Sequence, residues 1–366
     1  MMMNDNTHIV EPFDPSKIDV DIANVNLGSL LEQLENNEID LEPDFQRASD
    51  IWSATQKSRL IESILLGLPL PSFYFCEDSY SDRLVIIDGL QRLCALRDFI
   101  IEKEDPLILQ NLQFLKDYNG LNYEELSRPD VRRIKALKIT INTLRRSTPE
   151  KVKYILFQRV NTAGVPLMPQ EMRHALNQGQ AAVFIKELAR EESFKQATCY
   201  SIRTKRMDDR DFANRFVAFY LGLEDYTGDL DAFMNERMGS LNHMTQEDLK
   251  NIRHAFVNSM KCCFKIFHDD TFRRRKSIYD RRRPISKAVY DSLSVNVAWL
   301  SDEERKVLVE KATLVRTEMI SLFNNDKFDN AISTGTATKY AVATRFEMIG
   351  NVLHKIINDD SKVNNQ

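Results

Sequence analysis

The sequence has little of what marks a secreted or membrane-bound protein. Its five cysteines, at positions 76, 94, 199, 262 and 263, form no C-x-x-C pair. An odd and scattered set of this kind is typical of reduced intracellular thiols, and the adjacent Cys262 and Cys263 fit the apolar face of a helix. No apolar run approaches the roughly 18 residues that a membrane helix needs, and the polar N-terminus has no signal-peptide core. We therefore expect a cytoplasmic protein.

The common nucleotide and metal motifs are also missing. The chain has neither G-x-x-x-x-G-K-[ST] nor G-x-G-x-x-G, so nucleotide chemistry of those two types is excluded. Its six histidines include no pair at metal-ligand spacing, which argues against a zinc site. The net charge of −4 gives no overall attraction to nucleic acid, so any such contact has to come from a local patch.

The chain does have enough apolar sequence for a large core, with 43% hydrophobic residues in a length of 366. Residues 1–21 are polar and show no sustained period, which predicts a flexible arm. Residues 22–170 mix patterns, with strands expected at 72–76, 84–87 and 134–144. Residues 171–366 carry helix patterns almost throughout. The chain is therefore expected to be an α+β domain followed by a mostly α-helical domain.

Two local patterns add detail to this division. Ser53 and Gln56 have the spacing of a capping box, which predicts a helix that begins there. In the second part, a helix with Phe212, Phe216 and Phe219 is expected to dock on the N-terminal domain.

The candidate site lies where a predicted strand turns sharply into a predicted helix. The β-branched run 84–87 ends at Asp88 and Gly89, and apolar residues then recur at helical spacing. Free backbone N–H groups and the positive end of a helix dipole make such a turn suitable for an anion. Gly89 permits close approach of a ligand, Asp88 supplies a carboxylate, and Gln91 and Arg92 add an amide and a guanidinium. The pattern predicts a phosphate site.

A purely structural interpretation stays open for the same residues. Asp88 would cap the helix, Gly89 would only make the turn, and Arg92 would pair with a surface carboxylate. Spacing alone favours this second interpretation.

Further motifs bear on that choice. The chain contains DFQR at 44–47, Trp52, LIESILLGLPLPSFYF at 60–75, IDGLQRL at 87–93 and FQRVN at 157–161. In this order the motifs resemble the N-terminal domain of GmrSD-type restriction systems, whose signature is D-G-Q-Q-R. The resemblance implies a ParB/sulfiredoxin-like fold for the N-terminal domain. Leu90 stands where the family usually has its first Gln, so one amide is lost.

The resemblance also implies a function. It points to an NTP-binding, and NTP-hydrolysing, module of a bacterial anti-phage or modification-dependent restriction system that acts on DNA, standing alone without the HNH nuclease half. Asp88 would bind Mg²⁺ or orient water, and Gln91 would hold that water or a phosphate. Arg92 and Arg47 would neutralise phosphates beside Gly89. The alternatives are a non-catalytic ParB-like DNA-binding protein and an adaptor that recruits a separate nuclease. The expected partners are DNA, a separate nuclease subunit and a second copy of the chain in a homo-oligomer.

A second motif would close this site. The resemblance gives Arg159 and Asn161 of FQRVN a role in nucleotide binding. The structural alternative makes Arg159 a charge at the C-terminal end of a helix and Asn161 its C-cap.

A basic run in the second part predicts a nucleic-acid contact, because arginine binds phosphate oxygens through two parallel N–H groups. The alternative is a solvated face. The run surrounds Tyr279 and consists of Arg273, Arg274, Arg275, Lys276, Arg281, Arg282 and Arg283.

Overall fold

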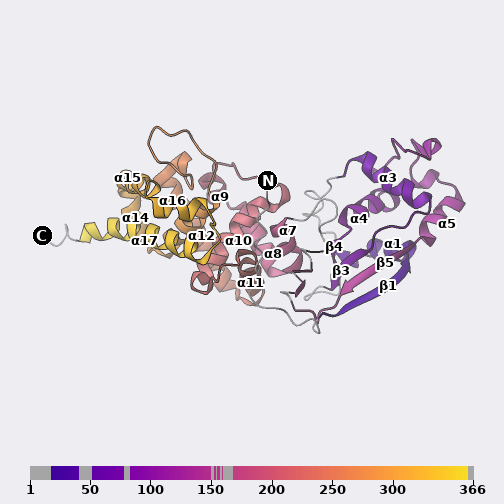
Figure 1. Ribbon diagram of the computed structural model, residues 1–366, viewed down its shortest axis with the longest axis horizontal. Coiled ribbons are helices and arrows are strands. Elements are labelled where there is room, and N and C mark those ends of the chain that lie inside the picture. Colours follow the sequence, from indigo (N-terminus) through magenta and orange to yellow (C-terminus); the bar gives the residue numbers. More distant parts are fainter. Residues whose placement is uncertain are drawn as a thin grey trace. The chain divides into compact units, whose positions relative to one another are not determined.

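The computed structural model describes residues 18–40, 52–77, 83–149, 152–153, 155–156, 159 and 168–361. The chain divides into two compact units, Met1–Leu176 (unit 1) and Asn177–Gln366 (unit 2) (Figure 1). Unit 1 contains a sheet with helices and unit 2 is helical, which confirms the expected α+β class. The ParB/sulfiredoxin-like fold stays a prediction. None of the helices in the described ranges combines the length with the apolar character that a bilayer-crossing segment requires.

Unit 1 is built on a mixed sheet in the order β1-β5-β3-β4-β2. The β1–β5 and β3–β4 pairs are antiparallel, and the β5–β3 and β4–β2 pairs are parallel. β4 therefore has a partner on each side at Leu84 and Val85, and its last residue, Asp88, pairs with Tyr74 of β3. The strands are β1 (Val20–Asn26), β2 (Ile39–Asp40), β3 (Phe73–Glu77), β4 (Leu84–Asp88) and β5 (Lys138–Leu144).

Two helices of unit 1, α3 and α5, begin at serine caps. Ser53 accepts the Gln56 N–H and Gln56 accepts the Ser53 N–H, so the predicted capping box is confirmed at the start of α3. α4 continues into a π-helical turn at Arg97–Ile101. The α-helices of this unit are α1 (Leu27–Glu35), α3 (Ala54–Leu65), α4 (Leu90–Leu96), α5 (Arg128–Ala136) and α7 (Pro169–Leu176).

Three boundaries differ from the sequence-based expectation. A strand begins at Val20, inside the expected arm, because β1 pairs with β5 from Val20 opposite Leu144. The expected strand at 134–144 starts only at Lys138, because Ser127 caps a helix that runs to Ala136. The contact boundary between the units follows α7 rather than preceding it, since α7 packs against β4. Residues 1–17 of the expected arm lie outside the described residues.

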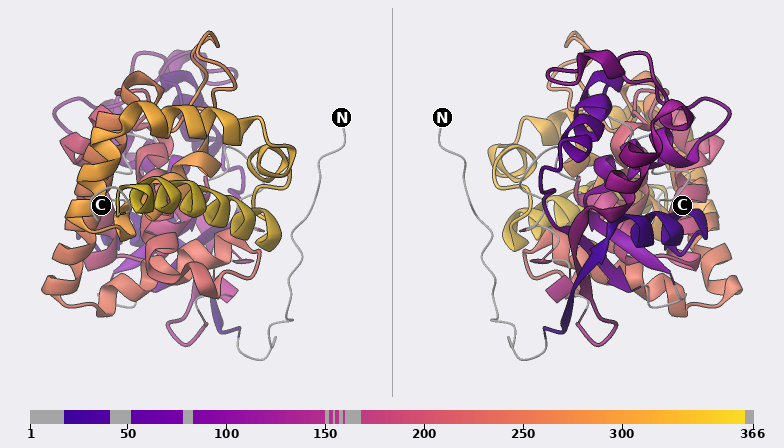
Figure 2. Two further views of the ribbon diagram at one scale, coloured as in Figure 1. Left: turned by 90° about the vertical axis from the view of Figure 1, so that its left-hand side faces the viewer. Right: turned by 90° about the vertical axis from the view of Figure 1, so that its right-hand side faces the viewer.

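Unit 2 contains helices of very different lengths, and the left-hand view of Figure 2 looks onto its orange and yellow ones. Its longest two are α12 and α17, which both pack on α13. The helices are α8 (Gln180–Arg190), α9 (Glu192–Ala197), α10 (Asp208–Gly222), α11 (Leu230–Ser240), α12 (Gln246–Phe267), α13 (Lys287–Trp299), α14 (Asp302–Glu310), α15 (Ala312–Phe323), α16 (Asp326–Ser333) and α17 (Lys339–Ser361).

The core of unit 2 accounts for the phenylalanines of α10. Phe212, Phe216 and Phe219 are buried in the hydrophobic cluster of this unit. The expectation that they dock on the N-terminal domain is wrong, because α8, α11 and α13 of their own unit cover them. Cys262 and Cys263 are buried in the same cluster, as the sequence predicts.

Candidate functional site

The turn between β4 and α4 is shaped by a glycine that no other residue could replace without strain. Gly89 has φ of 106°, in the left-handed region, and precedes the first residue of α4. A Cβ atom at this position would lie 2.5 Å from Cδ1 of Phe73 and 3.1 Å from Nη2 of Arg92. The close approach predicted for Gly89 is therefore made to residues of the protein itself.

Arg92, in the first turn of α4, is buried and bonded within the unit. Only 8% of the residue is exposed. Its Nη1 donates to the Pro71 carbonyl, while Nη2 donates to the Ser72 carbonyl at 3.1 Å and to Oδ2 of Asp88 at 2.9 Å. The guanidinium also lies 4.4 Å from the centre of the Phe73 ring. Arg92 thus ties the start of β3 to the end of β4, which is the role of a positioning residue.

Asp88 ends β4 and keeps part of its carboxylate in contact with solvent. Its side chain is 23% exposed. Burial raises the pKa of the Asp88 carboxyl, although the Arg92 charge and the Gly89 N–H act in the opposite direction. A carboxylate with a raised pKa is a better proton acceptor than a fully solvated one.

The sheet is irregular beside this carboxylate. Tyr74 of β3 pairs with Asp88, but the next pair is Phe75 with Ile86, so the register shifts by one residue. Such bulges occur often next to active sites, where they change the direction of a side chain. Arg92 forms an ion pair, as the structural interpretation expects, but its partner is Asp88 and not a separate surface carboxylate. The expected cap is not formed, because the N-cap residue of α4 is Gly89 and no side chain caps the helix.

Gln91 connects α4 to the segment before α3. Its Oε1 accepts the backbone N–H of Trp52 at 3.1 Å. On the other side of residues 41–51, Asp40 of β2 pairs with Val85 of β4. Asp40 and Trp52, the described residues on either side of DFQR, are therefore held by β4 and α4. Arg47 itself lies outside the described residues. Leu90, in place of the family's Gln, is buried.

The second predicted motif is described only in part. Arg159 is exposed, and Asn161 lies outside the described residues. Leu156 packs against the cluster that contains Val85 and Ile87, so the segment before Arg159 is held against β4. That Arg159 lies at the same site as Asp88 stays a prediction.

A magnesium ion fits this site only if most of its ligands come from elsewhere. Among the described residues, no group of three or more His, Cys, Asp or Glu side chains could hold a metal ion. Magnesium usually takes one or two carboxylates, with water and substrate phosphates completing its octahedron. Asp88 can supply one such carboxylate, which fits an ion that arrives with a nucleotide.

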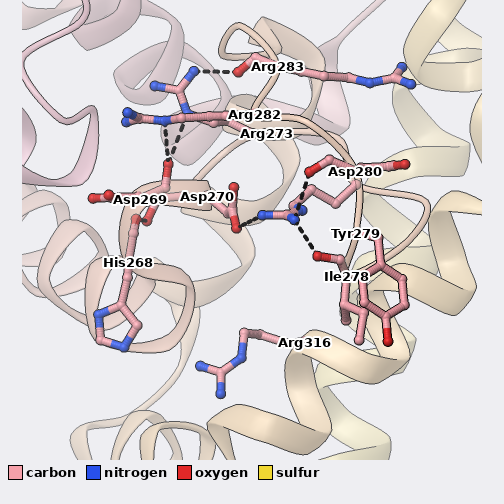
Figure 3. Close-up of polar contacts among 12 residues, drawn as sticks. His268, Asp269, Asp270, Arg273, Ile278, Tyr279, Asp280, Arg282, Arg283 and Arg316 are labelled. Atoms are coloured by element: carbon pink, nitrogen blue, oxygen red, sulfur yellow. Dashed lines mark hydrogen bonds and ion pairs between the residues drawn. The ribbon is translucent and has the colours of Figure 1, made fainter.

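The basic run of unit 2 divides into two groups of different surroundings (Figure 3). Arg273 is buried and donates to the carbonyls of Asp269 and Arg283 and to the Ser201 hydroxyl. The ion pairs of the next three residues join Arg274 and Lys276 to Asp329 and Arg275 to Asp270. The first four cations of the run are therefore bonded to groups of unit 2, and Arg273 alone among them is buried.

The second group lies on the surface. Arg281, Arg282 and Arg283 are exposed, and Tyr279 is 90% exposed. Arg282 donates through Nε to the Asp269 carbonyl at 3.1 Å, which holds its stem near the loop base. The run predicted as one footprint consists of a structural half and a surface half.

Several residues at the first site were not predicted from the sequence. Phe73 forms the aromatic platform under Arg92, and its position inside an apolar strand gives no separate signal of this. Glu62 of α3 accepts the backbone N–H groups of Gln113, Phe114 and Leu115 and so fixes the loop after α4. No sequence signal marks Glu62, because its partners are backbone N–H groups 51 to 53 residues further along the chain.

Residues 27–177 match the family described as GmrSD restriction endonuclease, N-terminal domain. The match begins with α1 and ends directly after α7, so it covers the β4–α4 turn and all of unit 1 that follows β1. No curated protein and no solved structure matches the chain significantly. Residues 27–177 of this chain are therefore a member of the family of GmrSD restriction endonuclease N-terminal domains.

Proposed function

We propose that this chain acts in a bacterial restriction system directed at DNA, and that unit 1 binds a nucleoside triphosphate at the β4–α4 turn and hydrolyses it. The family match supports the restriction-related role. The observation that carries the nucleotide site is Asp88, a partly exposed carboxylate beside a register shift, held by a buried arginine.

The assigned roles follow from these contacts. Phosphoryl transfer needs positioning and charge neutralisation more than covalent chemistry. Asp88 orients the attacking water or holds the magnesium ion that accompanies the phosphates. Water attacks the terminal phosphorus atom, and the bond between that phosphorus and the bridging oxygen breaks. Inorganic phosphate and a nucleoside diphosphate then leave.

Arg92 has a different role in this proposal from the one that the sequence predicts. Three of its N–H groups already bind Pro71, Ser72 and Asp88, so Arg92 positions Asp88 and does not contact phosphate. The positive charge needed at the phosphates then falls to Arg47 and Arg159. The family motifs are the first reason for this proposal. The second is that residues near these two arginines are anchored, since Trp52 is hydrogen-bonded to Gln91 of α4 and Leu156 packs against the cluster that contains Val85 and Ile87 of β4.

A non-catalytic DNA-binding role, with or without a recruited nuclease, is the second candidate. Two observations favour it. Leu90 puts a buried apolar side chain where the family has an amide, and three N–H groups of Arg92 are bonded within the protein. A ParB/sulfiredoxin-like scaffold would then present unit 1 to DNA without turnover.

Phosphate release separates the two candidates. The purified protein is incubated with each of the four common ribonucleoside triphosphates and Mg²⁺, with and without DNA, beside Asp88→Asn and Asp98→Asn. Asp98 is a matched control, because it is also a partly buried acid in an ion pair, with Lys57 and Arg97. We expect release with at least one nucleotide, loss of release in Asp88→Asn, and retention in Asp98→Asn. Absence of release under every condition would leave the non-catalytic candidate.

A further inference from the structure

The exposed half of the basic loop differs from an ordinary solvated face in the way its charges are presented. Asp280 is the acidic residue within the run, and its Oδ2 accepts the backbone N–H groups of Lys276 and Ser277. Its carboxylate is therefore turned to the loop's own backbone. The neighbouring Arg281, Arg282 and Arg283 are exposed, so the surface of the loop is strongly positive.

Arg273 holds the two ends of this loop together by hydrogen bonds to its backbone. Its Nη1 donates to the Arg283 carbonyl, and its Nε donates to the Asp269 carbonyl at 3.0 Å. Arg282 donates to that same Asp269 carbonyl (Figure 3). Arg282 and Arg283 of the exposed triplet are thus both tied to the contact between Arg273 and Asp269, which lowers the conformational entropy that a ligand would otherwise have to remove.

A second basic segment shares the same anchor. Nη2 of Arg273 donates to the Ser201 hydroxyl at 3.1 Å. Arg203 and Lys205, a few residues further along the chain, are exposed. The hydrogen bond therefore joins the segment at Ser201 to the base of the basic loop, and Arg203 and Lys205 follow in the same segment.

The tip of the loop adds an aromatic and an aliphatic side chain. Tyr279 is 90% exposed and Ile278 is 67% exposed, although burial of such side chains is normally favourable. Exposed apolar groups beside arginines occur at DNA interfaces, where they pack on sugars or insert between base steps.

We infer that Arg281, Arg282 and Arg283, with Arg203, Lys205 and Tyr279, form a surface that binds the phosphate backbone of double-stranded DNA. This inference rests on the proposed function only for the choice of DNA as the partner. Guanidinium groups bind phosphate oxygens in pairs, and contacts to phosphate fix register without reading bases. Arg273, Arg274, Arg275 and Lys276 hold the loop and do not contact DNA.

The test is a salt titration of binding to a labelled DNA duplex of mixed sequence. The full-length protein is compared with the triple variant Arg281→Ala, Arg282→Ala, Arg283→Ala. A charge-matched control carries Lys250→Ala, Lys261→Ala and Lys306→Ala, at exposed positions on α12 and α14. Each phosphate contact contributes about 0.9 to the slope of log affinity against log salt. We expect the triple variant to lose about two units of slope and at least ~10-fold in affinity, and the control to lose neither.

Three results would overturn the inference. Equal slopes and affinities for all three proteins would show that the exposed triplet makes no contact with DNA. Equal losses in the triple variant and the control would show that overall charge alone is being measured. Binding of the unaltered protein to vesicles of phosphatidylserine and phosphatidylcholine, without binding to DNA, would assign the surface to a membrane.

Phosphate release distinguishes this inference from the proposed function. Without DNA, the triple variant should release phosphate at the rate of the unaltered protein, because its substitutions lie in unit 2. DNA binding that depends on the triplet, in a protein without phosphate release, would support the surface and contradict the nucleotide site.

Discussion

Arg92 and Asp88 are joined across one helical turn by a 2.9 Å hydrogen bond, and the same guanidinium binds the backbone of Pro71 and Ser72. Burial lowers the pKa of Arg92 and raises the pKa of Asp88, so both charges are held in place against a desolvation cost. A pair of this kind is a poor source of stability and a good source of fixed geometry. It holds a partly exposed carboxylate at the end of an interior strand.

Gly89 should tolerate alanine much less well than Gly120, although both have positive φ. At Gly120 nothing lies within 4 Å of the new Cβ, whereas at Gly89 the Phe73 ring lies 2.5 Å away. Backbone strain alone costs roughly 1–3 kcal/mol, so Gly89→Ala should lose clearly more than Gly120→Ala in urea unfolding. Equal losses would show that the close approach to Phe73 has no energetic effect.

Glu62 should make the stability of unit 1 depend on pH in the acid range. Burial opposes its ionisation, but the N–H groups of Leu115, Phe114 and Gln113 outweigh this and lower the pKa of Glu62 below its ordinary value of 4.5. Because the folded pKa is the lower one, the contribution is present above pH 4.5 and is lost as the pH falls through the folded pKa.

Glu62→Gln should therefore be less stable than the unaltered protein by roughly 2 kcal/mol at pH 7, and the difference should shrink at pH values below the folded pKa. Urea unfolding at neutral and acid pH measures both. A difference that stays constant with pH would mean that Glu62 does not bind the loop as a carboxylate.

Arg273 and the exposed triplet should separate stability from DNA binding. Arg273→Ala removes three hydrogen bonds of a buried group and should lower the free energy of unfolding by about 2–4 kcal/mol. The variant Arg281→Ala, Arg282→Ala, Arg283→Ala should change it by less than ~0.5 kcal/mol per residue. Comparison of unfolding curves checks this. If the triple variant lost as much free energy of unfolding as Arg273→Ala, the whole basic run would be structural.

Leu90→Gln restores the family's signature and tests what the missing amide does. The side chain is buried, so an amide there should cost about 1–3 kcal/mol of stability. We expect phosphate release to be unchanged or raised. A fall in release with the fold intact would show that the apolar side chain is itself required.

The elements near the site were predictable because their signals are local. The capping box of Ser53, the turn at Gly89 and the strand that precedes it all depend on neighbours within a few residues. The family motif supplied the rest, since spacing alone favoured a structural interpretation.

The contacts that decide the roles are not local. Arg92 donates to the carbonyls of Pro71 and Ser72 in the connection between α3 and β3. Arg274 and Lys276 form ion pairs with Asp329 on α16. Backbone carbonyls and distant carboxylates leave no pattern around an arginine in the sequence. A basic run therefore looks uniform in the sequence even where the fold pairs half of its cations with groups of the protein.

The most direct measurement of the central claim is the turnover number for phosphate release by Asp88→Ala beside the unaltered protein, with the nucleotide that gives the highest rate. Urea unfolding of both proteins establishes that the variant is folded. The proposed function predicts that turnover falls to the level of buffer while the unfolding transition is retained. Turnover by a folded Asp88→Ala variant at the rate of the unaltered protein would contradict the assignment of the β4–α4 turn as the catalytic site.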